Sequence, residues 1–117
     1  MASRSTIEVL EDHLERRRRG DIDGDLECNY AHDVVLLCEH GAFKGHVAVR
    51  NSAQALIDQL PDACYQFPLK QIQGEHALLH RNARSSKARV DFGVDVFVIR
   101  DGRIVLQTVS YVLKQES

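Results

Sequence analysis

The 117-residue chain has 15 basic and 17 acidic side chains, a net charge of −2, and 44% apolar residues. This length and composition predict one globular domain spanning residues 1–117. The balanced charge argues against binding to nucleic acids or anionic membranes, which requires a concentrated positive field. No apolar stretch is long enough to span a membrane and no signal-peptide pattern is present, so we expect a cytoplasmic protein.

The first half of the chain has helical spacing of apolar residues. Ser5 and Glu8 match a capping box that begins a first helix, and Gly20 ends this helix. Its apolar positions, spaced for one face, are Ile7, Leu10 and Leu14. Asp21 is the expected N-cap of a short second helix that ends near Tyr30. A third helix ends at Pro61 and has its apolar residues on one side, at Val49, Ala53, Leu56 and Leu60.

One basic cluster, residues 16–19, lies at the predicted C-terminus of the first helix. Four consecutive residues spread around most of a helix, so they form no single binding stripe. Their position favours the helix dipole, and Asp12–Arg16 and Glu15–Arg19 are spaced for ion pairs one turn apart. We therefore interpret the cluster as a solvated helix end.

The second half of the chain predicts β-strands. Four long strands are expected at residues 65–73, 77–85, 90–100 and 104–113, and a strong hairpin signal, Asp101-Gly102, joins the last two. A shorter apolar strand at 34–38 is expected to be buried on both faces, and residues 41–45 are interpreted as a turn-rich link. Helices followed by an antiparallel meander indicate an α+β domain.

Alternation separates the two faces of the last hairpin. In strand 90–100 one face comprises Asp91, Gly93, Asp95, Phe97 and Ile99, and the other comprises Val90, Phe92, Val94, Val96 and Val98. We expect the first face to lie under the helices and the valine-rich face to meet a partner subunit. On strand 104–113 the matching pocket side comprises Val105, Gln107, Val109, Tyr111 and Leu113.

Asp95 is unusual because it places a carboxyl group on the apolar inner face of a central strand. Burial of an unpaired charge is costly, so two interpretations remain open. Asp95 pairs with an arginine or caps a backbone amide, or it is a protonated carboxyl group with a raised pKa that donates a hydrogen bond inside a pocket. Tyr30 either points into that pocket or packs between helix and sheet, and His80 faces either the pocket or the dimer interface.

The sequence resembles the SnoaL-like and ketosteroid-isomerase-like members of the NTF2-like superfamily. The similar segments are GDIDG at 20–24, YAHDVV at 30–35, the loop at 41–45, VDVF at 94–97 and DGRI at 101–104. The resemblance implies an NTF2-like (cystatin-like) cone, in which three N-terminal helices pack on a curved, mainly antiparallel sheet around a pocket, commonly as a dimer.

The resemblance also implies site residues. In ketosteroid isomerases a carboxylate base moves a proton next to a carbonyl, while a tyrosine and a protonated aspartic acid stabilise the oxygen. By position, Asp95 matches that aspartic acid, His13 matches the tyrosine, and Cys38, with Glu39 beside it, matches the base. Because two of these three positions differ, the usual steroid isomerisation is not expected.

We therefore expect binding of a small, mostly apolar molecule, with acid–base chemistry of an isomerase, lyase or hydrolase type. The candidate catalytic residues are Asp95, His13 and Cys38. The candidate ligand-binding residues are Tyr30, Glu39, Phe97, Gln107, Val109 and Tyr111. A non-catalytic dimeric ligand-binding module, or a protein-interaction module that uses the valine-rich face, is the alternative.

No cofactor or metal is expected. The sequence has neither a phosphate-binding glycine-rich loop nor a paired-cysteine motif. His76 and His80 would share a strand face but lie too far apart for one metal ion. Cys28, Cys38 and Cys64 are expected to be free thiols.

Overall fold

The helices form where the spacing of apolar residues predicts them. The computed structural model describes residues 3–115, so residues 1–2 and 116–117 of the predicted domain lie outside the described part. Helix α1 spans Thr6–Arg18, α2 spans Ile22–Asn29 and α3 spans His46–Gln59. No helix in this part of the chain is long and apolar enough to cross a membrane.

The predicted capping box at the start of α1 is confirmed. The Glu8 amide donates to the Ser5 hydroxyl oxygen at 3.2 Å, and the Ser5 amide donates to the Glu8 carboxylate at 2.8 Å. The predicted apolar face needs correction, because Ile7 is 42% exposed. The buried residues of α1 are Val9, Leu10 and His13.

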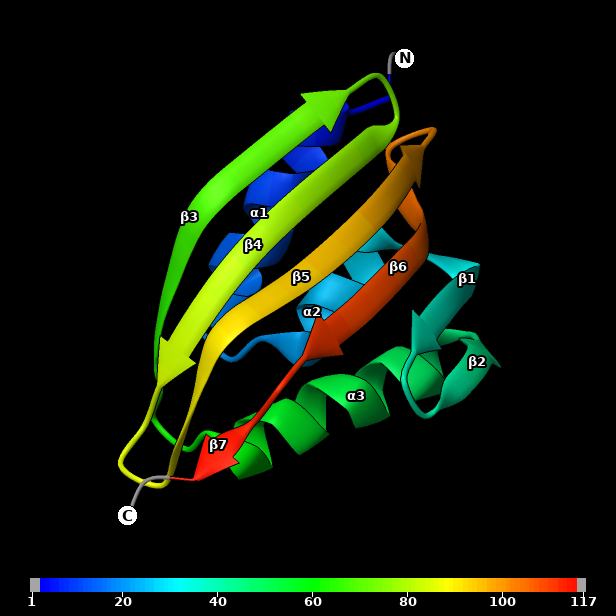
Figure 1. Cartoon of the computed structure of the whole chain (residues 1–117). Helices are drawn as coiled ribbons and strands as arrows, with labels where there is room; N and C mark the ends of the chain where they lie inside the picture. The colour runs from blue at the N-terminus through cyan, green and yellow to red at the C-terminus, as the bar shows by residue number, and fades with distance from the viewer. Residues whose placement is uncertain (1–2, 116–117) are drawn as a thin grey trace.

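The strands form one mixed, curved sheet. They are β1 (Tyr30–Cys38), β2 (Gly41–Lys44), β3 (Cys64–Gln73), β4 (His76–Arg84), β5 (Ala88–Arg100), β6 (Arg103–Tyr111) and β7 (Lys114–Gln115). The strand order is β2-β1-β6-β5-β4-β3, with β7 paired to β5. Only β1 and β6 pair in parallel within residues 3–115. The three helices lie on the same side of this sheet (Figure 1), which is the predicted α+β cone arrangement.

Two expectations for the first strands are wrong. Residues 41–44 are the edge strand β2, because they pair antiparallel with the free side of β1, from Cys38↔Gly41 to Val35↔Lys44. In β1, Leu36 is buried but Leu37 is 40% exposed, because the helices cover only one face of the sheet.

Irregular pairing corrects the predicted faces of β5. Arg81 pairs with Gly93 whereas Ala83 pairs with Val90, so β5 has one extra residue between these two pairs. Val90 is therefore buried with the inner face, and Asp91 is exposed. The strict alternation assumed from the sequence fails at this point.

The same effect occurs in β6. Val98 pairs with Leu106 whereas Ile99 pairs with Ile104, so Val105 is the extra residue. Ile104 is fully buried instead of facing outward. Beyond Ile104 the predicted inner face is regular, because Gln107 pairs with Phe97, Val109 with Asp95 and Tyr111 with Gly93. The strand ends at Tyr111, before the predicted Leu113.

The main hydrophobic core lies between the inner sheet face and the helices. It joins Val9, Leu10, Leu26, Tyr30, Val34, Val49, Ala77, Leu79, Phe97, Ile99 and Ile104. A smaller cluster lies near the end of α3 and comprises Leu60, Ala83, Ala88 and Val90. The space between these two clusters contains the candidate site.

Candidate functional site

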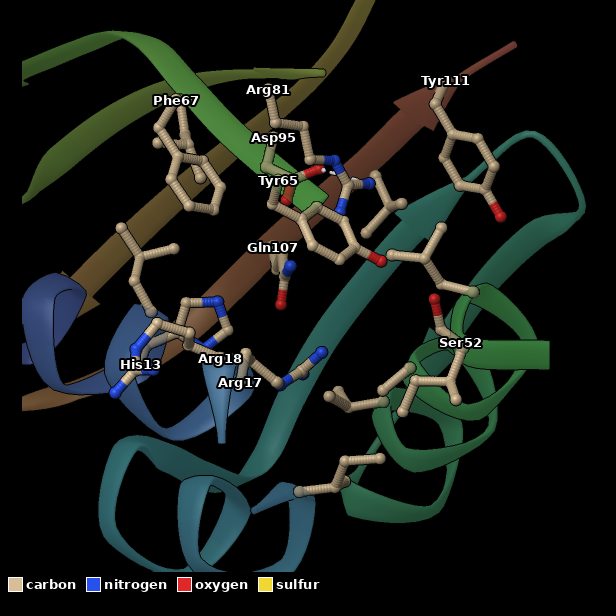
Figure 2. A pocket seen from close by; sticks show the side chains of 18 of the residues that line it. His13, Arg17, Arg18, Ser52, Tyr65, Phe67, Arg81, Asp95, Gln107 and Tyr111 are labelled. Carbon is tan, nitrogen blue, oxygen red and sulfur yellow. Dashed lines mark ion pairs between the residues drawn. The ribbon is translucent and has the colours of Figure 1, made fainter. Parts of the chain in front are cut away.

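A cavity of about 610 Å³ lies between the inner face of the sheet and helices α1 and α3. Its lining is mostly apolar and includes Leu36, Leu79 and Val109. Figure 2 shows polar side chains entering it from several elements, with His13 and Arg17 on α1 facing Gln107, Asp95 and Arg81 on the sheet. A cavity of this size with few polar groups is typical of small-molecule sites.

Asp95 lies in the middle of β5 and is only 3% exposed. Its Oδ1 atom lies 3.4 Å from Nη2 of Arg81, beyond good hydrogen-bonding distance but close enough for an ion pair. Burial raises the pKa of Asp95 and outweighs the opposing effect of the positive charge on Arg81. The structure thus contains both features that the sequence left as alternatives, a nearby arginine and a raised pKa.

A buried hydrogen bond holds His13 in place. Its Nδ1 atom lies 2.8 Å from Oδ2 of Asp25, a residue of α2 that is fully buried. Arg17 Nε donates to the same oxygen at 2.6 Å, and Asn29 donates to the other carboxylate oxygen at 2.8 Å. Burial alone would raise the pKa of Asp25, but the hydrogen bond to His13 and the charge of Arg17 lower it below its ordinary value. Asp25 is therefore an ionised group that orients His13.

Tyr30 and Gln107 form a second buried contact at the floor of the cavity. The Tyr30 hydroxyl donates to Oε1 of Gln107 at 2.5 Å, and Arg17 Nη2 approaches the same hydroxyl at 3.4 Å. Tyr30 is fully buried and packs between helix and sheet, while Gln107 lines the cavity. Gln107 also forms a side-chain hydrogen bond with Asp95, which counteracts the effect of burial on the pKa of that carboxyl group.

The structure brings five of the predicted site residues to one place. Asp95, His13, Gln107, Val109 and Tyr111 all line the cavity. Phe97 and Tyr30 lie in the core, where each ring contacts the edge of the His13 ring, with centroids 5.4 and 5.8 Å away. These two residues pack against the His13 ring and do not line the cavity themselves.

Cys38 and Glu39 are not brought to the cavity. Among the described residues that line it, β1 contributes Leu36, and the strand ends at Cys38. The following turn directs Glu39 away, so that its side chain is 75% exposed and lies 3.7 Å from His40. The three cysteines, at positions 28, 38 and 64, are free thiols as expected. No three His, Cys, Asp or Glu side chains within residues 3–115 lie close enough together to hold a metal ion.

Several cavity residues were missed by the sequence analysis. Arg17 is half-buried and faces the cavity, which corrects the interpretation of residues 16–19 as a wholly solvated helix end. Arg17 follows Leu10 by seven residues and Leu14 by three, so the helical repeat places all three on one face of α1. This spacing was the signal in the sequence that Arg17 faces inward. Arg81 shares the inner face of β4 with Leu79, and alternation on that strand would have found it.

Two ion pairs expected on the first helix are present. Asp12–Arg16, at 2.8 Å, and Glu15–Arg19, at 4.0 Å, form the expected pairs.

Similarity to this chain is found among solved structures. No protein-family model matches the chain, and no curated protein matches it. Among solved structures, an NTF2-like protein from Burkholderia xenovorans covers 96% of this chain and 92% of its own, at 19% identity and a TM-score of 0.70. The chain has the NTF2-like fold.

Two structures with this NTF2-like fold carry a proposed activity. A proposed SnoaL-like polyketide cyclase from a Jannaschia species has a TM-score of 0.79 at 10% identity, covering 91% of this chain and 84% of its own. A proposed polyketide cyclase from Sinorhizobium meliloti has a TM-score of 0.73 at 21% identity, covering 88% and 94%. These similarities establish the fold, and the site of this chain must be interpreted from its own residues.

Proposed function

We propose that this chain is a SnoaL-like acid–base enzyme that acts on a small, mostly apolar carbonyl compound. The supporting observation is that His13, oriented by the buried Asp25, and the buried carboxyl group of Asp95 line the same apolar cavity. Two solved structures that share the fold are proposed polyketide cyclases, which supports an enzymatic role for a cavity of this kind.

The proposed reaction begins with proton abstraction from carbon. Asp25 occupies Nδ1 of His13, which leaves Nε2 to take a proton from the carbon next to the substrate carbonyl. The electron pair of the broken C–H bond moves to the carbonyl oxygen, forming an enolate. In this proposed step the protonated form of Asp95, which burial favours by raising its pKa, donates a hydrogen bond to this oxygen, and Arg81 adds positive charge beside it. Return of the proton from His13 to another carbon gives isomerisation. In ring closure the enolate carbon attacks a second carbonyl carbon, the electron pair of that C=O bond moves to its oxygen, and His13 returns the proton to this alkoxide.

The test is exchange of carbon-bound hydrogen in D₂O. With 2-tetralone as a small apolar ketone, NMR follows the loss of its acidic C–H signal. We expect saturable exchange by the wild-type protein and a rate lower by about 10²–10⁴-fold in His13→Gln, the range for loss of a general base. His40→Gln, on an 82% exposed side chain, is the matched control and should exchange at the wild-type rate. Binding of 2-tetralone without exchange above background would instead support a non-catalytic binding module.

We also propose that two copies pair through the outer sheet face. Along β5 this face comprises Val94, Val96 and Val98, flanked by Leu78 on β4 and Leu106 on β6, and its residue Phe92 is 60% exposed. His80, the residue whose direction the sequence left open, contacts the Phe92 ring edge with centroids 4.7 Å apart and so lies on this face. Sedimentation should give a dimer for the wild type and a smaller species for Phe92→Asp, and a wild-type monomer at micromolar concentration would contradict the proposal.

A further inference from the structure

Two polar atoms in the cavity lack hydrogen-bond partners. Among the described residues, Nη2 of Arg81 and Oδ1 of Asp95 are the buried side-chain nitrogen and oxygen atoms without one. The side chains of Arg81 and Asp95 are only 12% and 4% exposed. Leaving such groups unpaired costs free energy, so the pair is arranged for a ligand group that supplies the missing hydrogen bonds.

The other charged groups of the cavity already have partners. Arg17 and His13 both bind Asp25. At the cavity mouth, Arg18 bonds Glu15 at 2.6 Å and Lys70 lies 3.3 Å from Glu11. The Arg81–Asp95 pair is thus distinguished from them by its unused hydrogen-bonding capacity.

Residues on three neighbouring strands, β4, β5 and β6, determine the position of the Arg81 side chain. Its neighbour across the sheet is Gly93, and a Cβ atom at Gly93 would lie 3.1 Å from Cγ and Nε of Arg81. The absent side chain therefore leaves the space in which Arg81 lies flat on the sheet. From the other side, the Tyr111 ring lies 5.4 Å from Cζ of the guanidinium, a cation–π distance. Figure 2 shows the guanidinium held between Asp95 and Tyr111 and facing the cavity.

We infer that Arg81 and Asp95 together bind an acidic oxygen group, so that the substrate is an apolar molecule bearing a carboxylate or an acidic enol. This inference rests on the proposed function, because it takes the cavity to be the substrate site. A guanidinium donates two parallel hydrogen bonds to such a group, and a protonated carboxyl group beside it adds a third donor. Nη2 of Arg81 lacks an acceptor, and an anionic oxygen of the ligand supplies both that acceptor and a negative charge close to the guanidinium.

The test compares two probes of nearly equal shape, 1-naphthylacetate and its neutral amide, 1-naphthylacetamide. Calorimetric titration at neutral pH should show the carboxylate binding the wild-type protein about tenfold or more tightly, the range for hydrogen bonds to charged groups. Arg81→Met should abolish this preference while retaining binding of the amide. Arg100→Gln is the control, because it also removes one positive charge, at an exposed pair with Glu75 far along the sheet. This variant should keep the preference for the carboxylate.

Arg81→Lys provides a second variant that retains the charge, and we expect it to keep part of the preference. Equal binding of the two probes, an unchanged preference in Arg81→Met, or no binding of the carboxylate at millimolar concentration would each overturn the inference. The 2-tetralone exchange assay separates the two proposals because its substrate is neutral. A carboxylate preference without His13-dependent exchange would refute only the catalytic proposal, and the reverse result would refute only this inference.

Discussion

Removal of the Tyr30 hydroxyl tests whether the buried contact below the cavity stabilises the fold. In Tyr30→Phe, Oε1 of Gln107 loses the donor that lies 2.5 Å away in a fully buried position. An unsatisfied buried acceptor costs about 1–3 kcal/mol. For a chain of this length about 4 °C of melting temperature corresponds to 1 kcal/mol, so we expect a decrease of roughly 4–12 °C.

Tyr111→Phe is the matched control for Tyr30→Phe. The Tyr111 hydroxyl donates to Oε1 of Gln59 at 2.7 Å in an exposed position, where water can replace it. We expect this variant to melt within about 2 °C of the wild type by circular dichroism. Equal melting temperatures for the two variants would refute the argument, because they would show that the Tyr30–Gln107 contact contributes no more than a solvated one.

Two further predictions concern the Arg81–Asp95 pair. Because burial raises the pKa of Asp95 above its ordinary value of 3.8, the folded protein retains a proton that the unfolded chain has released. The stability that this proton contributes to the wild type is complete below about pH 4 and is lost as pH rises. Asparagine does not titrate, so the urea midpoint of Asp95→Asn relative to that of the wild type should increase between about pH 4 and pH 8. A relative decrease would show that Asp95 is ionised in the fold. Gly93→Ala should displace Arg81 and reduce the carboxylate preference in the calorimetric titration, and an unchanged preference would contradict the packing argument.

The order of elements was accessible from local pattern. The capping box at Ser5, the helical spacing of Leu10 and Leu14, and the hairpin signal at residues 101–102 depend on neighbours within a few positions. Their structures agree, since short-range geometry alone decides them. The inner positions of Asp95 and Gln107 were found by alternation, because both lie in regular stretches of strand.

The errors occur where distant parts of the chain decide the outcome. The extra residues near Asp91 and Val105 reverse the expected faces because the partner strand sets the register, and no local signal marked them. Residues 41–44 became a strand because β1 presents a free edge to them.

The candidate site divides in the same way. Composition and alternation were enough to place a carboxyl group among apolar residues on an inner strand face, since side-chain direction along a regular strand is a local property. Only the tertiary structure brings His13 and Arg17 from α1 to Asp25 on α2, and lays Arg81 across Gly93 beside Asp95. These contacts join residues 8 to 14 positions apart on separate elements. Their distances depend on how the helices and the sheet pack, which local pattern does not encode.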